Sequence, residues 1–187
     1  MPETPLYTAT FTVDSQVDLP VFISDLSNTV SAHLPLAPAE ADVVLFKLRV
    51  IVSELLTNTI KHTQESATTL LRVTITSDGM QLIRQDDCAP MHFPANDKRP
   101  SLVWPIPAEH CNHRYTVYED DLNALSLSIN DTGTASFYAW QNPDALINIP
   151  SLNEHFGLLM IALSTQAFTY EYQPATKANI FTASIEF

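Results

Sequence analysis

Three polar side chains of different chemistry share one face of the strongest helix that the sequence predicts. Glu54, Asn58 and Lys61 stand at positions i, i+4 and i+7, and His62 lies at the edge of the same face. A carboxylate, an amide and a cation are costly to place beside an apolar core without partners. They are therefore either parts of a functional site or the solvated side of an amphipathic helix.

The helix that carries these groups is predicted over residues 39–62. A strand over residues 7–13 precedes it, followed by a shorter helix that opens at Asp18, has Pro20 in its first turn and ends before Pro35. Apolar residues recur along the long helix at steps of four, three and four, and they are Val44, Leu48, Ile51 and Leu55. This spacing predicts a continuous buried stripe, so the helix is expected to be a core element.

Runs of β-forming residues dominate the rest of the chain. Strands are expected over residues 70–76, 80–84, 115–118, 125–129, 135–140, 168–172 and 180–187. A helix is expected over 153–166 with Asn153 as its cap, and residues 86–113 are expected to be irregular. The expected fold class is α+β, a two-layer sandwich with helices on one face of a mixed, mostly antiparallel sheet. One domain is expected over residues 1–187.

Composition excludes several classes of function. The chain has 187 residues, and 9 Lys and Arg against 21 Asp and Glu give a net charge of −12, which repels nucleic acid and anionic membrane surfaces. Three glycines are too few for an intact Walker loop or Rossmann fingerprint. No signal peptide is visible, and Cys88 and Cys111 are too few for a disulfide framework. A cytoplasmic protein with reduced thiols is expected.

Residues 54–62 read ELLTNTIKH and meet the pattern E-x-x-x-N-x-x-(K/R)-H at every marked position. This pattern is that of the N-box helix in the GHKL or Bergerat-fold ATPases, which the chain resembles, and within them it is most similar to the anti-sigma-factor serine kinases. Residues 86–91, DDCAPM, are similar to the family's D-D-G-x-P-F box, and residues 155–161, HFGLLMI, to its G-x-G-L-x-(L/M)-I box. The resemblance covers nearly the whole chain outside residues 92–150 and implies a Bergerat-like fold.

The resemblance implies a role for each matching residue. Asn58 would help to hold Mg²⁺ among the phosphates of ATP, since this hard cation prefers oxygen ligands. Glu54 would orient or deprotonate the attacking group, a water or a protein hydroxyl. Lys61 or His62 would lie near phosphate, and Asp86 would accept a hydrogen bond from the adenine amino group.

The glycine boxes depart from the family pattern. Gly157 would still let the backbone approach the phosphates at the start of a helix. However, Cys88 and His155 replace two of the family's glycines, and the usual glycine-rich lid is absent. A β-rich insertion over residues 92–150 stands in its place and is expected to be a rigid element. A competing acidic box at Asp131 is interpreted as a hairpin turn.

Two functions follow as expectations. The first is a regulatory protein that binds ATP and Mg²⁺ and phosphorylates serine or threonine in a protein partner, either a sigma factor or a protein like an anti-sigma antagonist. A homodimer is left open. The second is a catalytically silent protein-interaction module that has lost nucleotide binding. A third alternative is a metal site built from Cys88, His92, Glu109, His110, Cys111 and His113.

Overall fold

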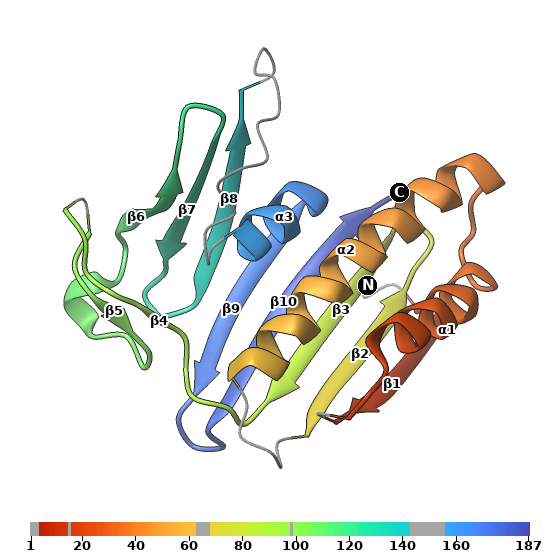
Figure 1. Ribbon diagram of the computed structural model, residues 1–187, viewed down its shortest axis with the longest axis horizontal. Coiled ribbons are helices and arrows are strands. Elements are labelled where there is room, and N and C mark those ends of the chain that lie inside the picture. The colour runs from red at the N-terminus through yellow and green to blue at the C-terminus, as the bar shows by residue number, and fades with distance from the viewer. Residues whose placement is uncertain (1–3, 15, 63–67, 98, 143–155) are drawn as a thin grey trace.

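One large antiparallel sheet dominates the protein (Figure 1). The computed structural model describes residues 4–14, 16–62, 68–97, 99–142 and 156–187. Within them, eight strands form the sheet in the order β1-β2-β3-β10-β9-β8-β7-β6. These strands are β1 (Tyr7–Val13), β2 (Thr69–Ile75), β3 (Gly79–Asp86), β6 (Arg114–Glu119), β7 (Asn123–Ile129), β8 (Ala135–Gln141), β9 (Ala167–Gln173) and β10 (Ala178–Glu186).

The remaining elements are α-helices and short pieces of the segment between β3 and β6. The α-helices are α1 (Leu19–Ser31), α2 (Pro38–His62) and α3 (Phe156–Ser164). The short pieces are β4 (His92–Phe93), β5 (Leu102–Val103) and a 3₁₀ turn, η1 (Ala108–His110). In the part of the chain that the structure describes, no helix is both long enough and apolar enough to cross a membrane.

The fold class expected from the sequence, an α+β two-layer sandwich of Bergerat type on a mixed sheet, is wrong. The protein is mostly sheet, with 40% of it in strands and 30% in helices. All strand pairs of the eight-stranded sheet are antiparallel. Strands β6, β7 and β8, which were expected in an insertion, extend this same sheet through the pairing of β8 with β9.

Local sequence signals explain the first two helices. Asp18 caps α1, because its carboxylate accepts a hydrogen bond from the Val21 backbone N–H, and Pro20 lies in the first turn. The apolar stripe expected on the long helix is confirmed in α2, where Leu48 and Ile51 are fully buried. In Figure 1, α2 crosses in front of β3 and β10.

A chain of aromatic contacts attaches the segment between β3 and β6 to the sheet. Trp104 is buried, its indole lies edge-on to both Phe93 and Tyr170, and its Nε1–H donates to the Gly133 carbonyl. Tyr170 in turn contacts Phe181, at 4.8 Å between ring centroids. Because edge-on and tilted rings are favourable contacts, this segment is held in place even though it has little regular structure.

Candidate functional site

Two of the polar residues on α2 meet the start of α3. Glu54 and Asn58 are half-buried. A Cβ atom added to Gly157 would lie 2.4 Å from Glu54 Oε2 and 3.7 Å from Asn58 Nδ2. The backbone of α3 therefore approaches this face of α2 so closely that a larger residue at position 157 would have to displace the Glu54 carboxylate. Three of the residues that the sequence singled out are thus brought together.

The other residues expected near phosphate cannot be placed in the same way. Lys61 and His62 belong to the last turn of α2, but their side chains lie outside the described residues. Asn153, the expected helix cap, and His155, which replaces a family glycine, also lie outside the described part of the chain.

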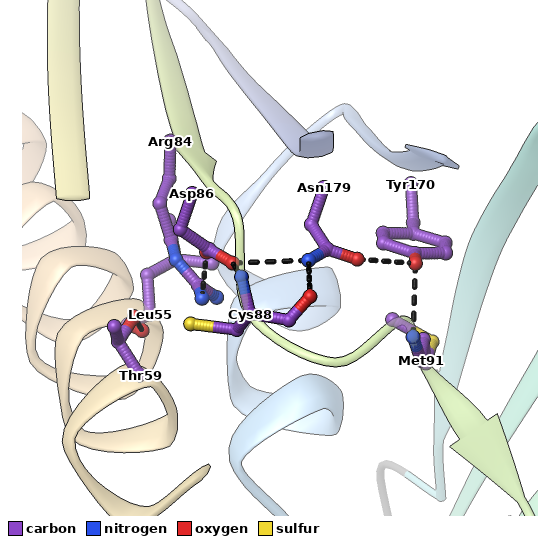
Figure 2. A network of polar contacts seen from close by, with 8 residues as sticks. All are labelled: Leu55, Thr59, Arg84, Asp86, Cys88, Met91, Tyr170 and Asn179. Carbon is purple, nitrogen blue, oxygen red and sulfur yellow. Dashed lines mark hydrogen bonds and ion pairs between the residues drawn. The ribbon is translucent and has the colours of Figure 1, made fainter. Parts of the chain in front are cut away.

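Asp86 ends β3 and is fully committed to partners within the protein (Figure 2). Its carboxylate forms an ion pair with Arg84. Its Oδ1 also accepts hydrogen bonds from the Cys88 backbone N–H, at 3.0 Å, and from Asn179 Nδ2, at 3.0 Å. Only 4% of the residue is exposed. The group expected to bind adenine therefore already has three protein donors.

Arg84 is the residue that neutralises this buried carboxylate. It precedes Asp86 by two positions on β3, so both side chains lie on the same face of the strand. The guanidinium group points toward the part of α2 that holds Leu55 and Thr59 (Figure 2) and lies 4.8 Å from the Phe181 ring centroid. Burial lowers the pKa of Arg84, and the charge of Asp86 opposes that shift.

A hydrogen-bonded relay extends from Asp86 across β10 and β9. Asn179 Nδ2 also donates to the Cys88 carbonyl at 2.9 Å, while its Oδ1 accepts from the Tyr170 hydroxyl at 2.7 Å. The Tyr170 oxygen in turn accepts from the Met91 backbone N–H. Burial raises the pKa of Tyr170, so the hydroxyl remains protonated and keeps its donor role. This relay fixes the loop after β3 to the sheet.

Sequence reasoning missed Arg84, Tyr170 and Asn179. One signal for Arg84 was available, because it shares the alternate positions of β3 with Met80 and Leu82, which predict that this side of the strand faces inward. Its pairing with Asp86 follows from that shared face. Neither Asn179 nor Tyr170 carries such a signal, since their partners are set by the pairing of distant strands.

The histidines proposed as metal ligands have other partners. His92 Nε2 lies 3.2 Å from Ser101 Oγ, His110 Nδ1 lies 3.0 Å from the Tyr115 hydroxyl, and His113 Nδ1 lies 2.8 Å from the Cys111 carbonyl. Among the described residues, no three His, Cys, Asp or Glu side chains gather as a metal site would require. The metal alternative is therefore not supported there.

The interpretation of the segment around Asp131 as a turn is confirmed. It joins β7 to β8, and Asn130 Oδ1 accepts from the backbone N–H groups of Thr132 and Thr134. Gly133 adopts a φ of 81°, a conformation that favours glycine. The acidic side chain is exposed on this turn.

A scan against protein-family models finds no match, and a search of curated proteins finds no related sequence. The similarity to Bergerat-type ATPases therefore rests on the motifs at residues 54–62, 86–91 and 155–161 alone.

Proposed function

We propose that this chain is a regulatory protein that acts by binding another protein and does not bind a nucleotide at Asp86. The observation that carries the proposal is the ion pair between Asp86 and Arg84. A carboxylate that accepts from adenine needs a free oxygen facing an open space, whereas this one is buried and bound by three donors. To admit an adenine base, the ion pair would have to break, and both buried charges would then lack compensation.

An exposed apolar ridge on α2 supports binding to a protein. Val43 is 56% exposed and Phe46 is 64% exposed, and the half-buried Val50 follows at helical spacing on the same side. This side is opposite to the buried stripe that contains Leu48 and Ile51. Large apolar side chains grouped on a helix surface are typical of sites at which another protein packs.

The motif similarity indicates the kind of partner, and the cysteines indicate the compartment. The partner is a protein of the sigma-factor regulatory kind, either a sigma factor or a protein like an anti-sigma antagonist. Both Cys88 and Cys111 are free thiols, which fits a reducing compartment, so the proposal places the protein in the cytoplasm.

Two measurements test this function. Calorimetric titration with Mg-ATP is expected to give no binding heat with the wild-type chain. In native extracts, the wild-type chain and a Val103→Ser control are expected to retain the same partner, and Phe46→Ser is expected to lose it. Val103 is a suitable control because it is also exposed and apolar but lies on β5. Retention of the partner by Phe46→Ser would contradict the proposed surface.

A second candidate function is an ATP-dependent serine/threonine kinase, and one observation favours it. Gly157 at the start of α3 lies against both Glu54 and Asn58, as a phosphate and Mg²⁺ site at a helix start would need. In that function Asn58 would help to hold Mg²⁺, and Glu54 would take the proton of the attacking hydroxyl in a transfer of the γ-phosphoryl group from ATP to the partner that leaves ADP. Lys61 or His62 would contact phosphate.

The same titration distinguishes the two candidates. Magnesium-dependent binding of ATP that is lost in Asn58→Ala would establish the second function. Asn58 is the residue of choice because it is only half-buried and takes no part in the Asp86 network. Its replacement therefore tests ligand binding without disturbing the buried ion pair.

A further inference from the structure

The two outer strands of the sheet differ in how well they are protected. Strand β6 carries Arg114 and Glu119 at its ends, and its pairing with β7 shifts register between Thr116 and Tyr118. Charges and bulges of this kind prevent an edge strand from pairing with another chain. In the described structure, β6 is therefore a protected edge.

Strand β1 has none of these features. Its seven residues, YTATFTV, include no charge and no proline, and they pair with β2 without a register shift. β2 is its single neighbour among the described strands. Every second backbone N–H and C=O of β1 along the outer edge is therefore available to another strand.

The apolar layer beside this edge is incomplete. Helix α1 runs antiparallel to β1, since Phe22 near its start contacts Phe11, and His33 just beyond its end stacks on Tyr7. Tyr7, Phe11 and Phe22 remain only half-buried, whereas Leu71 and Val73 of the next strand are fully buried. An apolar margin is thus left open along the outer side of β1 and α1.

We propose that a second copy of this chain covers this margin, with the two β1 strands pairing antiparallel about a two-fold axis at Thr10. Pairing centred on the middle of β1 uses the whole strand, because Tyr7 then lies opposite the partner's Val13 and Ala9 opposite the partner's Phe11. A two-fold axis requires a surface that complements itself. Here a small residue meets a large one on the inner face.

The outer face of the pair is also self-complementary. Thr8, Thr10 and Thr12 are exposed and lie on the same side of β1. In the paired strands Thr8 faces the partner's Thr12, and Thr10 faces the partner's Thr10. Cross-strand pairs of threonine are favourable in antiparallel sheets.

The helix layer has room for the second copy. In each copy β1 and β2 together are about 9.6 Å wide, so two α1 helices, each lying over its own β1 and β2, would also lie about 9.6 Å apart. Packed helices have axes about 8–10 Å apart, which matches this distance. An α1 helix and its copy can therefore lie side by side over the four outer strands, and each brings the half-buried Phe22, which contacts Phe11 of β1, toward the joint. The net charge of −12 on each copy opposes association, so added salt is expected to strengthen the dimer.

Sedimentation equilibrium of the full chain tests this pairing. The wild-type chain is expected to form a dimer whose dissociation constant decreases with salt. Thr10→Glu is expected to raise that constant by at least about tenfold, because two like charges then face each other at the axis. Within one copy the new carboxylate lies opposite Arg72, so the variant keeps its fold, which circular dichroism can verify.

A matched control is Gln81→Glu, which adds the same charge to an exposed position of β3, away from the edge. It is expected to dimerise like the wild-type chain. A monomeric wild-type chain in high salt would overturn the proposal, and so would equal dimerisation of Thr10→Glu and Gln81→Glu.

Disulfide cross-linking tests the register itself. Thr10→Cys is expected to cross-link with its own copy, whereas Thr8→Cys and Thr12→Cys are expected to cross-link only when the two are mixed. The wild-type chain is the control for any link through Cys88 and Cys111, its two free thiols. Failure of Thr10→Cys to cross-link beyond that control would overturn the pairing about this residue.

Discussion

Arg84 and Asp86 form an ion pair between two positions of the same strand, and both side chains are at least nine-tenths buried. The pair lies where the sequence predicted an acceptor for adenine. Arg84 Nε is buried without a hydrogen-bond partner, so the guanidinium depends on Asp86 for its compensation. The Asp86 carboxylate therefore serves as the buried counter-charge of Arg84.

Removal of this carboxylate is expected to destabilise the protein strongly. Asp86→Ala leaves the Arg84 guanidinium buried and uncompensated, which is expected to lower the free energy of unfolding by about 3–5 kcal/mol. Urea denaturation followed by circular dichroism measures this change. Asp87→Ala is the control, because Asp87 is exposed and its loss is expected to matter by less than about 0.5 kcal/mol. Similar stabilities for the two variants would contradict a structural role for Asp86.

A double-mutant cycle is expected to separate the ion pair from its surroundings. Asp86→Asn retains a side chain that can accept from Cys88 and Asn179 but removes the charge, and Arg84→Met removes the guanidinium at similar volume. The double variant is expected to lose less stability than the two single losses together, by about 0.5–3 kcal/mol. Additive losses in the denaturation curves would show that Arg84 and Asp86 do not stabilise each other.

Because Gly157 lies against Glu54, the effect of Gly157→Ala on stability is expected to change sign when Glu54 is also replaced by alanine. Gly157→Ala places a Cβ 2.4 Å from Glu54 Oε2, but this oxygen ends a flexible side chain and can move, so a small loss under about 1 kcal/mol is expected. In a Glu54→Ala background the obstacle is gone, and the better helix former is expected to stabilise α3 by up to about 1 kcal/mol. Thermal unfolding of the four proteins measures both steps. The same sign in both backgrounds would refute this account of the contact.

The turn between β6 and β7 is expected to depend on pH. A hydrogen bond from the Tyr118 hydroxyl, together with the Leu122 and Asn123 backbone N–H groups, lowers the pKa of Asp120 despite its partial burial. A carboxyl with a lowered pKa stabilises the fold above its unfolded pKa of about 4, and this contribution disappears as the pH falls through the folded value.

Asp120→Asn is therefore expected to be less stable than the wild-type chain at pH 7 and to approach it below about pH 4. Denaturation at a series of pH values measures the difference. A gap between the two proteins that stays constant down to pH 3 would show that Asp120 makes no ionised contribution. Asp121→Asn is the matched control, because this neighbour is exposed.

Local periodicity was sufficient to predict many elements but not their assembly. The strand at β1, the helix that opens at Asp18 and the stripe on α2 each depend on residues close in sequence, and all three are confirmed. The extent of the sheet depends on the pairing of β8 with β9, which uses only Ala135 with Tyr170 and Ser136 with Thr169. No local signal marks so short a contact, so β6 to β8 were assigned to an insertion.

The candidate site shows the same limit. The spacing of Glu54 and Asn58 predicted a shared face on α2, and Gly157 indeed lies against them. The surroundings of Asp86 were not predicted, because a motif identifies a carboxylate but not the charge that neutralises it. Its partner Asn179 is 93 residues away in sequence. Contacts of this range follow from the sheet as a whole.

The central position of β10 has a consequence for synthesis of the protein. β10 pairs with β3 on one side and β9 on the other, so the strand of this sheet that is synthesised after the other seven joins its two halves. Until then, β3 has an open inner edge, and the Arg84 and Asp86 charges lack the cover of Asn179. Contacts between such distant segments form slowly. The two halves of the sheet therefore stay unjoined until β10 has emerged from the ribosome.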